Sequence, residues 1–224
     1  DIYVINSCTV TAESDRKTRQ AVRRFRKNHP NSIIVLTGCM VQASPESEKL
    51  MPEADIIIGN KNNDTLYGII MQYIGNPCRI VNIESHKSGD KFRGDSLSSY
   101  SDKTRAIIKI EDGCNRFCSY CIIPYARGRI CSRPVSEIIA EIKDYTQDGY
   151  KEFVPTGIHI SSYGKDRPED GEDLLTLIQR MSETEGVKRI RLSSLEPRII
   201  TEDFARSLSE IEQLCPHFHL SLQS

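Results

Sequence analysis

The chain has 224 residues, with 30 Lys and Arg against 31 Asp and Glu, and this balance gives no overall attraction to nucleic acid or to an anionic membrane. The length allows a buried core without disulfides and favours two domains. No stretch approaches the roughly 18 apolar residues of a membrane span, and the first residues lack a signal-peptide pattern. The composition predicts a cytoplasmic protein with reduced cysteines.

The first part of the chain alternates short β-branched runs with helical patterns. We expect strands at 2–6, 33–37, 55–58 and about 79–83, and helices at 13–27 and 63–73. This alternation predicts an N-terminal parallel α/β domain of the flavodoxin-like kind, with three layers, over residues 1–83. The sequence begins inside one strand pattern and ends inside another, which is typical of a fragment cut at both ends.

A second β/α region follows a polar segment. Residues 84–103 are rich in Ser, Gly, Lys and Asp, so we expect a linker there. Over residues 104–224 the patterns predict strands at 104–110, 152–155, 188–192 and 217–222, and helices at 134–148, 172–184 and 201–214. Repeated β/α units favour a partial (β/α) barrel, with its chemistry at the C-terminal strand ends, and an open doubly wound sheet is the alternative.

Three cysteines lie close together in "EDGCNRFCSYCIIPYARGR", at Cys114, Cys118 and Cys121. This spacing would strain a disulfide and leave one thiol over, so metal binding is the better interpretation. Structural zinc needs four ligands, for which Cys131 is available. An iron–sulfur cube ordinarily takes four cysteines, so a set of three leaves one iron open to a small molecule.

The cysteine loop resembles that of radical S-adenosylmethionine (SAM) enzymes, and "IIPYARGRICSRP" narrows the resemblance to the methylthiotransferases. The resemblance implies a [4Fe-4S] cluster whose open iron chelates SAM and whose reduction releases a 5'-deoxyadenosyl radical. It implies that Tyr120 lies against the adenine of SAM. It also implies an electron donor, a reductant such as flavodoxin or ferredoxin.

Polar residues follow the expected strands of the second domain. Thr156 and Gly157, in "EFVPTGIHISSYGKD", stand where backbone groups of a barrel site reach the amino group of SAM. By resemblance, Glu196 in "RIRLSSLEPR" and Gln223 in "HLSLQS" bind the ribose and carboxylate of SAM; the alternative for each is an ordinary loop residue. His159 is a weaker candidate for substrate contact.

Two further cysteines follow strands of the first domain. Cys8, in "VINSCTV", and Cys39, in "LTGCMVQ", are expected at the same edge of the parallel sheet. Taken alone they are interpretable as small buried thiols. The resemblance implies instead that they hold two of three thiolates for a second [4Fe-4S] cluster, the third cysteine lying upstream of Asp1, so we expect that cluster to be incomplete in this chain.

Residues 16–27, "RKTRQAVRRFRK", form a basic helical pattern with seven cations and no acid. Such a run is usually a solvated face, but it also attracts an RNA backbone. We therefore expect tRNA contact through Arg23, Arg24 and Lys27.

Within the family, "GIHISSYG" and "SSLEPR" are most similar to the bacterial branch that converts threonylcarbamoyladenosine, next to the anticodon of tRNA, to its 2-methylthio derivative. The alternatives inside the family act on isopentenyladenosine in tRNA or on a ribosomal protein. Outside it, the alternatives are a non-catalytic RNA-binding protein with a zinc knuckle and a radical SAM enzyme that inserts no sulfur.

Overall fold

The computed structural model describes residues 1–44, 46, 49, 51–87, 89–92 and 104–222. They form two compact units, which interleave along the chain. Unit 1 contains Asp1–Ser88 and Asn115–Arg129, and unit 2 contains Gly89–Cys114 and Ile130–Ser224. The expected domain boundaries, with a linker at 84–103, remain a prediction. No described helix is long and apolar enough to cross a membrane.

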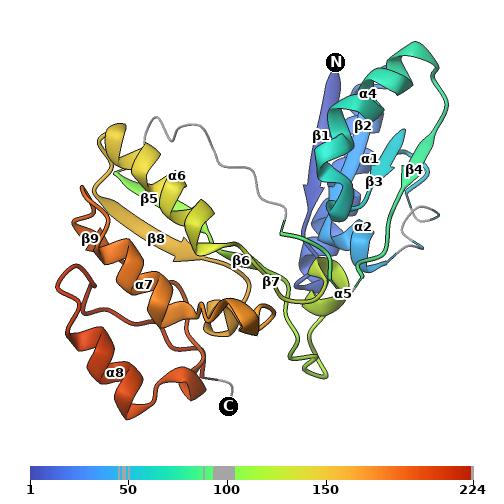
Figure 1. Ribbon diagram of the computed structural model, residues 1–224. Coiled ribbons are helices and arrows are strands. Elements are labelled where there is room, and N and C mark those ends of the chain that lie inside the picture. The colour runs from blue at the N-terminus through green and yellow to red at the C-terminus, as the bar shows by residue number, and fades with distance from the viewer. Residues whose placement is uncertain (45, 47–48, 50, 88, 93–103, 223–224) are drawn as a thin grey trace. The chain divides into compact units, whose positions relative to one another are not determined.

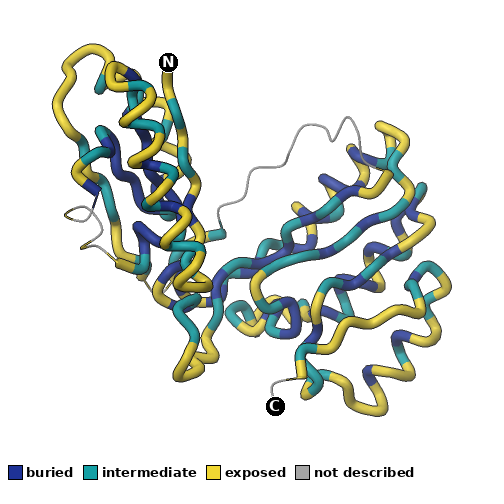
Figure 2. The backbone as a smooth tube through the Cα atoms, turned by 180° about the vertical axis from the view of Figure 1, so that it is seen from behind, coloured by how far each residue is buried: buried dark blue, intermediate teal, exposed yellow. Residues whose placement is uncertain are grey.

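Unit 1 is built on a parallel sheet with the strand order β1-β2-β3-β4 (Figure 1). The strands are β1 (Ile2–Ser7), β2 (Ile33–Gly38), β3 (Ile56–Ile58) and β4 (Ile80–Asn82). The central strands β2 and β3 are almost wholly buried, as their dark colour in Figure 2 shows. Long β-branched runs suit strands that are covered on both faces, so the expected strands and their parallel pairing are confirmed.

Helices cover both faces of this sheet. On one face, α1 (Ala12–Asn28) and α2 (Cys39–Ala43) pack on Ile34 and Leu36, and on the other, α4 (Leu66–Gly75) packs on Val35. Helix α1 begins at a Thr11 side chain that accepts the Ser14 N–H, as a threonine N-cap does. The expected three-layer α/β arrangement is confirmed for unit 1.

Two short segments of unit 1 were not expected from the sequence. The 3-10 helix η1 (Asn60–Thr65) precedes α4, where we expected one continuous helix from residue 63. Helix α5 (Ile123–Arg127) follows the cysteine loop and packs against α2. Thus the chain directly after Cys121 belongs to the same compact unit as Cys39.

Unit 2 contains a parallel sheet with the order β5-β8-β9, formed by β5 (Arg105–Lys109), β8 (Glu152–Thr156) and β9 (Arg189–Ile190). One apolar core joins the strands to α6 (Val135–Gln147), α7 (Leu174–Ser182) and α8 (Glu202–Ser209). Two strands, β6 (Glu111–Asp112) and β7 (Cys131–Ser132), pair in antiparallel fashion. The short helices η2 (Ile160–Ser162), η3 (Pro168–Asp170) and η4 (Pro197–Ile199) complete the unit. Parallel β/α units are what the partial barrel predicts.

The end of unit 2 differs from the sequence expectation. The prediction of a fourth strand at 217–222 is wrong, because Leu220 forms only a single parallel bridge, to Leu195. Its neighbours Phe218 and Leu222 are 45% and 76% exposed, so nothing in the described part of the chain buries a strand there. The preceding helix ends at Ser209 rather than near 214.

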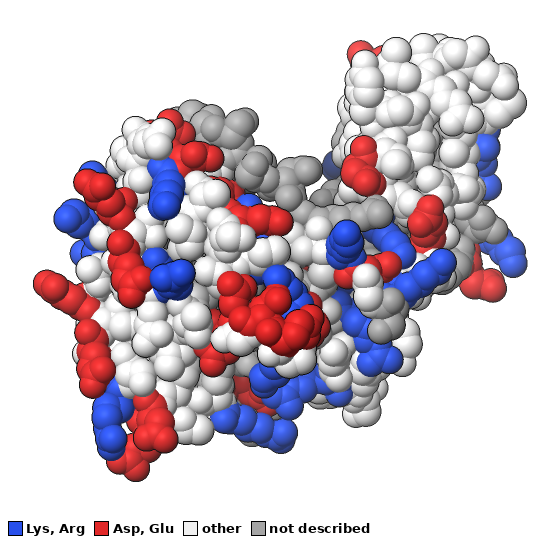
Figure 3. All heavy atoms as spheres, in the orientation of Figure 1, with Lys and Arg blue, Asp and Glu red and all other residues white. Residues whose placement is uncertain are grey.

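Acidic and basic side chains are interspersed over the face of unit 2 seen in Figure 3. Several form short-range ion pairs along helices, including Arg180–Glu183 and Arg206–Glu202. Such exposed pairs contribute little to stability. This visible face of unit 2 therefore presents no large single-sign field to a polyanion.

Candidate functional site

The cysteine loop runs from β6 to α5. The backbone N–H of Cys121 donates to the carbonyl of Cys118 at 2.9 Å, which closes a turn carrying two of the thiols. Phe117, just before this turn, has a φ of 48°, the left-handed region that bulky side chains avoid. The Arg129 guanidinium lies over the Phe117 ring, 4.3 Å from its centre. Packing therefore holds the loop in a conformation that its sequence alone disfavours.

The chemistry of the donor set fits an iron–sulfur cluster. All eight cysteines lie outside disulfides, and the thiols of the loop are partly or fully accessible. In the described part of the chain, no three His, Cys, Asp or Glu side chains converge on a common metal position. The fit thus rests on the type and spacing of three thiols in one loop, because thiolates are the usual ligands of such clusters.

Tyr120 stands between the last two thiols and is 74% exposed. Partial desolvation on the loop, followed by the nearby Cys118 and Cys121 thiols, raises the pKa of its phenol. An exposed aromatic ring beside the thiols offers a stacking surface to a flat ligand that reaches the loop. Contact with adenine remains a prediction.

The strand end at Thr156 and Gly157 contacts Glu111, which lies three positions before Cys114. Glu111 is fully buried, and its Oε1 accepts the backbone N–H of His159. A Cβ at position 157 would lie 2.2 Å from this oxygen, so only glycine allows the carboxyl group to approach. The strand-end loop is thereby fixed to the base of the cysteine loop, both parts belonging to unit 2.

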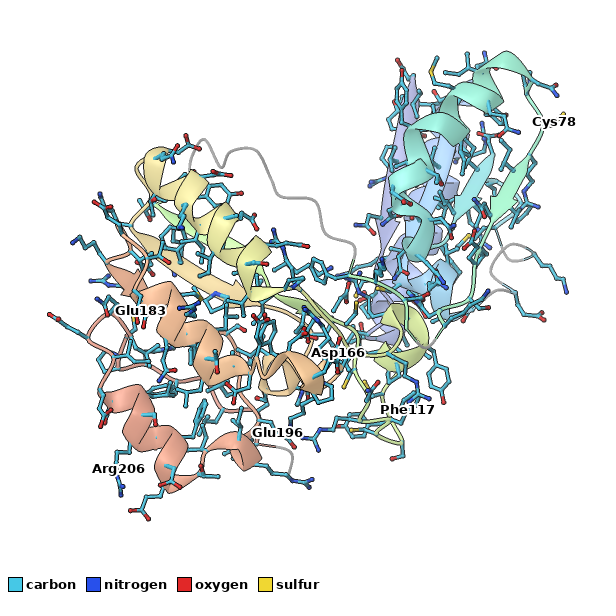
Figure 4. All side chains as sticks on the ribbon, in the orientation of Figure 1. Cys78, Phe117, Asp166, Glu183, Glu196 and Arg206 are labelled. Carbon is cyan, nitrogen blue, oxygen red and sulfur yellow. The ribbon has the colours of Figure 1, made fainter. Side chains whose placement is uncertain are left out.

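The same loop is joined to Glu196, which is labelled in Figure 4. Glu196 donates its backbone N–H to Ser161 Oγ at 2.9 Å, and its Oε2 lies 3.3 Å from His159 Nε2. The His159 Nδ1 lies 2.7 Å from Ser162 Oγ. The structure thus brings Gly157, His159 and Glu196 into one network, whereas Gln223 lies outside the described residues.

The buried carboxyl group of Glu111 is electrostatically unusual. Burial raises its pKa from 4.5 to about 7, against the lowering effect of the His159 N–H. Its Oε2 is buried without a hydrogen-bond partner among the described residues. Such a group is costly when ionised, so Glu111 is close to half-protonated near neutral pH.

Cys8 and Cys39 both follow the carboxyl ends of paired strands in unit 1. In the β1–β2 register Ser7 is opposite Gly38, so each cysteine comes one residue after a paired position. Ser7 Oγ donates to the Thr37 carbonyl at 2.6 Å and accepts the Met40 N–H at 3.2 Å, which ties the two strand ends together. The expected common sheet edge is confirmed, while iron ligation there remains a prediction.

The remaining cysteines lie elsewhere. Cys78, labelled in Figure 4, precedes β4, whereas Cys8 and Cys39 follow β1 and β2, so it is at the opposite edge of the parallel sheet. Cys131 donates its thiol to the Asp90 carbonyl at 3.1 Å, and burial, reinforced by nearby acids, raises its pKa to about 12. The Cys131 thiol is therefore protonated near neutral pH in the metal-free chain.

The expectation of seven uncompensated cations on α1 is wrong in part. Arg16 pairs with Glu13 at 2.6 Å, and Arg23 lies 3.2 Å from Glu53. Arg26 is three-quarters buried and pairs with Asp55 at 2.5 Å. Arg24 and Lys27 are exposed and have no acidic partner at ion-pair distance in the described part of the chain. RNA contact through this surface remains a prediction.

Sequence reasoning missed polar residues that organise these loops. Asp166, labelled in Figure 4, accepts the Ser132 N–H at 2.8 Å, and Ser132 Oγ in turn accepts the Gly164 N–H at 2.9 Å. The sequence offered a clue to Glu111, because an acidic residue at the end of an apolar strand pattern is rarely buried without a function. The sequence offered no clue to Asp166, because its partner Ser132 is 34 positions away.

Comparison with protein families matches both parts of the chain. Residues 1–59 match the Uncharacterized protein family UPF0004. Residues 108–224, more than half of the chain, match the Radical SAM superfamily. The chain belongs to the radical SAM superfamily. Radical SAM proteins work with a [4Fe-4S] cluster and SAM, and these cofactors suit the thiols of Cys114, Cys118 and Cys121.

Several bacterial relatives match this radical SAM chain over its whole length. Threonylcarbamoyladenosine tRNA methylthiotransferase MtaB of Bacillus subtilis (strain 168) is 38% identical over 224 residues, and that of Aquifex aeolicus (strain VF5) is 36% identical. The tRNA-2-methylthio-N(6)-dimethylallyladenosine synthase of Clostridium tetani (strain Massachusetts / E88) is 34% identical over 230 residues. The matches include 100% of this chain but 49%, 54% and 50% of those proteins, so the chain spans about half of their length.

Solved structures support the fold. The radical S-adenosylmethionine methyltransferase TsrM of Kitasatospora setae matches with a TM-score of 0.60 and 15% identity, over 98% of this chain and 47% of TsrM. The cobalamin-dependent S-adenosylmethionine radical enzyme OxsB matches with a TM-score of 0.50 and 11% identity, over 92% of this chain and 32% of OxsB. At such low identity the likeness concerns the fold alone.

Proposed function

We propose that the full-length protein is a radical SAM methylthiotransferase that modifies tRNA. The relatives that match the whole chain are named as tRNA methylthiotransferases or as a 2-methylthio-adenosine synthase. The chain combines the radical SAM region with a separate α/β unit whose sheet edge carries two thiols. A radical SAM enzyme that inserts no sulfur has no need of that second thiol set.

One observation of the structure carries this proposal. Helix α5, which directly follows the Cys118–Cys121 turn, packs against α2, the helix that begins with Cys39. Both helices belong to unit 1, so the two thiol-bearing segments meet within one compact body. Insertion of sulfur into an activated substrate needs a sulfur source near the radical, and this packing supports such an arrangement.

The cysteines fall into two sets of cluster ligands. Cys114, Cys118 and Cys121 hold the radical SAM cluster, while Cys8 and Cys39 contribute to a second [4Fe-4S] cluster associated with the sulfur. When bound, the radical SAM cluster and SAM supply the one-electron chemistry that side chains lack.

We assign SAM contacts to Tyr120 in unit 1 and to Thr156, Gly157 and Glu196 in unit 2. The network of Glu111 and His159 orients two of these residues, Gly157 and Glu196. The carboxylate of Glu196, half-enclosed beside His159, is an acceptor suited to ribose hydroxyls. Residues whose positions are fixed by such a network hold contacts more firmly than a mobile loop would.

We assign threonylcarbamoyladenosine next to the anticodon as the substrate, because the MtaB relatives reach 38% identity, within a range of 32–38%, against 31–34% for the dimethylallyladenosine enzymes. Digestion and mass spectrometry of tRNA from cells with and without the full-length gene test this assignment. Loss of the 2-methylthio group from threonylcarbamoyladenosine alone is the expected result. Loss from isopentenyladenosine would transfer the assignment to the second substrate, and unchanged tRNA would favour a protein substrate.

The remaining partners follow from this activity. The enzyme needs tRNA and an electron donor such as flavodoxin or ferredoxin, and it works in the cytoplasm, where tRNA is modified. Anaerobic reconstitution separates it from the zinc-knuckle alternative. A brown protein bleached by dithionite is expected, whereas zinc would leave the protein colourless.

A further inference from the structure

Asn60 connects three segments of unit 1 through its side-chain amide. Its Nδ2 donates to the Ala126 carbonyl of α5 at 2.6 Å and lies 3.7 Å from Cys39 Sγ, within reach of an N–H···S hydrogen bond. Its Oδ1 lies 3.3 Å from His86 Nε2. The amide thus contacts the first residue of α2, the helix after the cysteine loop and the segment after β4.

The orientation of this amide is determined by its partners. A backbone carbonyl only accepts hydrogen bonds, so the group that faces Ala126 must be the NH2 group. The second N–H of the same group is then available to the Cys39 sulfur. Asn60 therefore presents a donor, not an acceptor, to this sulfur.

The backbone around Asn60 is also held in place. The Lys61 N–H lies 3.3 Å from Gln42 Oε1, and the Gln42 side chain is buried and donates to the Glu84 carbonyl at 2.8 Å. At Gly59, a Cβ would lie 2.5 Å from Gln42 Oε1, so this approach requires glycine. The backbone that carries the amide is thus positioned by the buried Gln42 side chain.

We propose that Asn60 is a positioning residue that raises the reduction potential of the iron–sulfur centre bound through Cys39 and holds α5 beside that centre. This inference rests on the proposed function, in which Cys39 is a cluster ligand. An N–H···S hydrogen bond stabilises the more electron-rich reduced cluster, and donors of this kind tune cluster potentials. Because the same NH2 group holds Ala126, a shift of α5 would also move the donor relative to the sulfur.

The test uses the full-length protein with Cys114, Cys118 and Cys121 all changed to Ala, so that only the second centre takes up iron. Asn60→Leu, which is close in volume and has no donor, is introduced into this background. Redox titration followed by electron paramagnetic resonance measures the midpoint potential, and hydrogen exchange follows the amides of α5. We expect a lower potential and faster exchange in α5. Asn60→Asp, which adds a charge beside the sulfur, should lower the potential further.

Asn76→Leu is the matched control, because Asn76 is exposed and lies 3.6 Å from the unrelated Cys78. It should leave both measurements unchanged. Faster exchange in α5 at an unchanged potential would show a merely structural role and overturn the inference. Failure of the parent variant to bind iron would overturn the inference together with the second centre of the proposed function, whereas an unchanged potential in an iron-loaded protein would overturn the inference alone.

Discussion

The carboxyl group of Glu111 lies against the backbone of Gly157, where a Cβ would come within 2.2 Å of its Oε1. Gly157→Ala should therefore destabilise the chain by about 1–3 kcal/mol, because the fully buried Glu111 side chain has no free space to move into. Urea denaturation measures this change in the free energy of unfolding.

Gly68→Ala is the control for that substitution. Gly68 lies in α4 with nothing within 4 Å of an added Cβ, so alanine there should stabilise the chain by about 0.5–1 kcal/mol. In a Glu111→Ala background, Gly157→Ala should cost clearly less than in the parent. Equal costs in both backgrounds would contradict the contact.

Glu111 should make stability fall as pH rises. Its pKa is raised in the folded state from 4.5 to about 7, so the folded chain binds more protons than the unfolded chain between these values. This contribution is fully present below pH 4.5 and is lost as pH rises through about 7, by about 3 kcal/mol. Denaturation at the two ends of this window measures it. Glu111→Gln keeps an acceptor for the His159 N–H and should remove most of the loss; an undiminished loss would assign it to other groups.

Ser7 should stabilise unit 1 through its hydrogen bonds, independently of any metal bound by the neighbouring Cys8. Ser7→Ala removes the hydrogen bonds to the Thr37 carbonyl and from the Met40 N–H, both at buried residues, and should cost about 1–3 kcal/mol. Thermal and urea unfolding measure the change. Ser136→Ala, on the exposed face of α6, is the control and should stay within about 0.5 kcal/mol of the parent. Equal effects of the two variants would remove the claim that Ser7 ties the strand ends.

The cations of α1 should separate into structural and RNA-facing groups. Arg24→Gln with Lys27→Gln should weaken tRNA binding by the full-length protein and reduce the slope of its salt dependence by about 1–2. Filter binding at several salt concentrations measures both quantities. Unchanged affinity at low salt would reject this surface.

Arg26→Gln should act differently, because Arg26 holds Asp55 and the carbonyls of Glu53, Pro30 and Ser32. It should destabilise unit 1 by about 2–3 kcal/mol. Among folded molecules it should leave the salt dependence of tRNA binding near that of the parent.

The thiols should differ in their effect on iron content. Cys118→Ser should abolish the radical SAM cluster after anaerobic reconstitution, because thiolates are the ligands of such clusters. Cys131→Ser should retain it, since a serine hydroxyl can still donate to the Asp90 carbonyl. Iron and sulfide analysis of the two proteins tests the assignment. A loss of iron in Cys131→Ser would instead indicate that Cys131 is a fourth metal ligand.

Several features followed from the sequence alone because their signals are local. Short β-branched runs such as Ile33–Gly38 predict strands, and a loop with three thiols predicts metal binding, in each case from residues that are adjacent in the sequence. The parallel sheets and the common edge of Cys8 and Cys39 followed from the alternation of strands and helices. The expected strand at 217–222 failed because a strand pattern forms a sheet only where neighbours pair with it and bury it.

Tertiary structure alone decided which polar groups meet. The pairs Glu111–His159, Ser132–Asp166 and Asn60–Ala126 join residues 48, 34 and 66 positions apart, and no local pattern encodes such distances. The same holds for α1, where the seven cations of residues 16–27 are alike in the sequence, whereas folding brings Glu53 and Asp55 to some of them and leaves others in solvent. Residue type and spacing thus determined what chemistry the chain can do, while the burial and pairing of distant groups decided which residues are placed to do it.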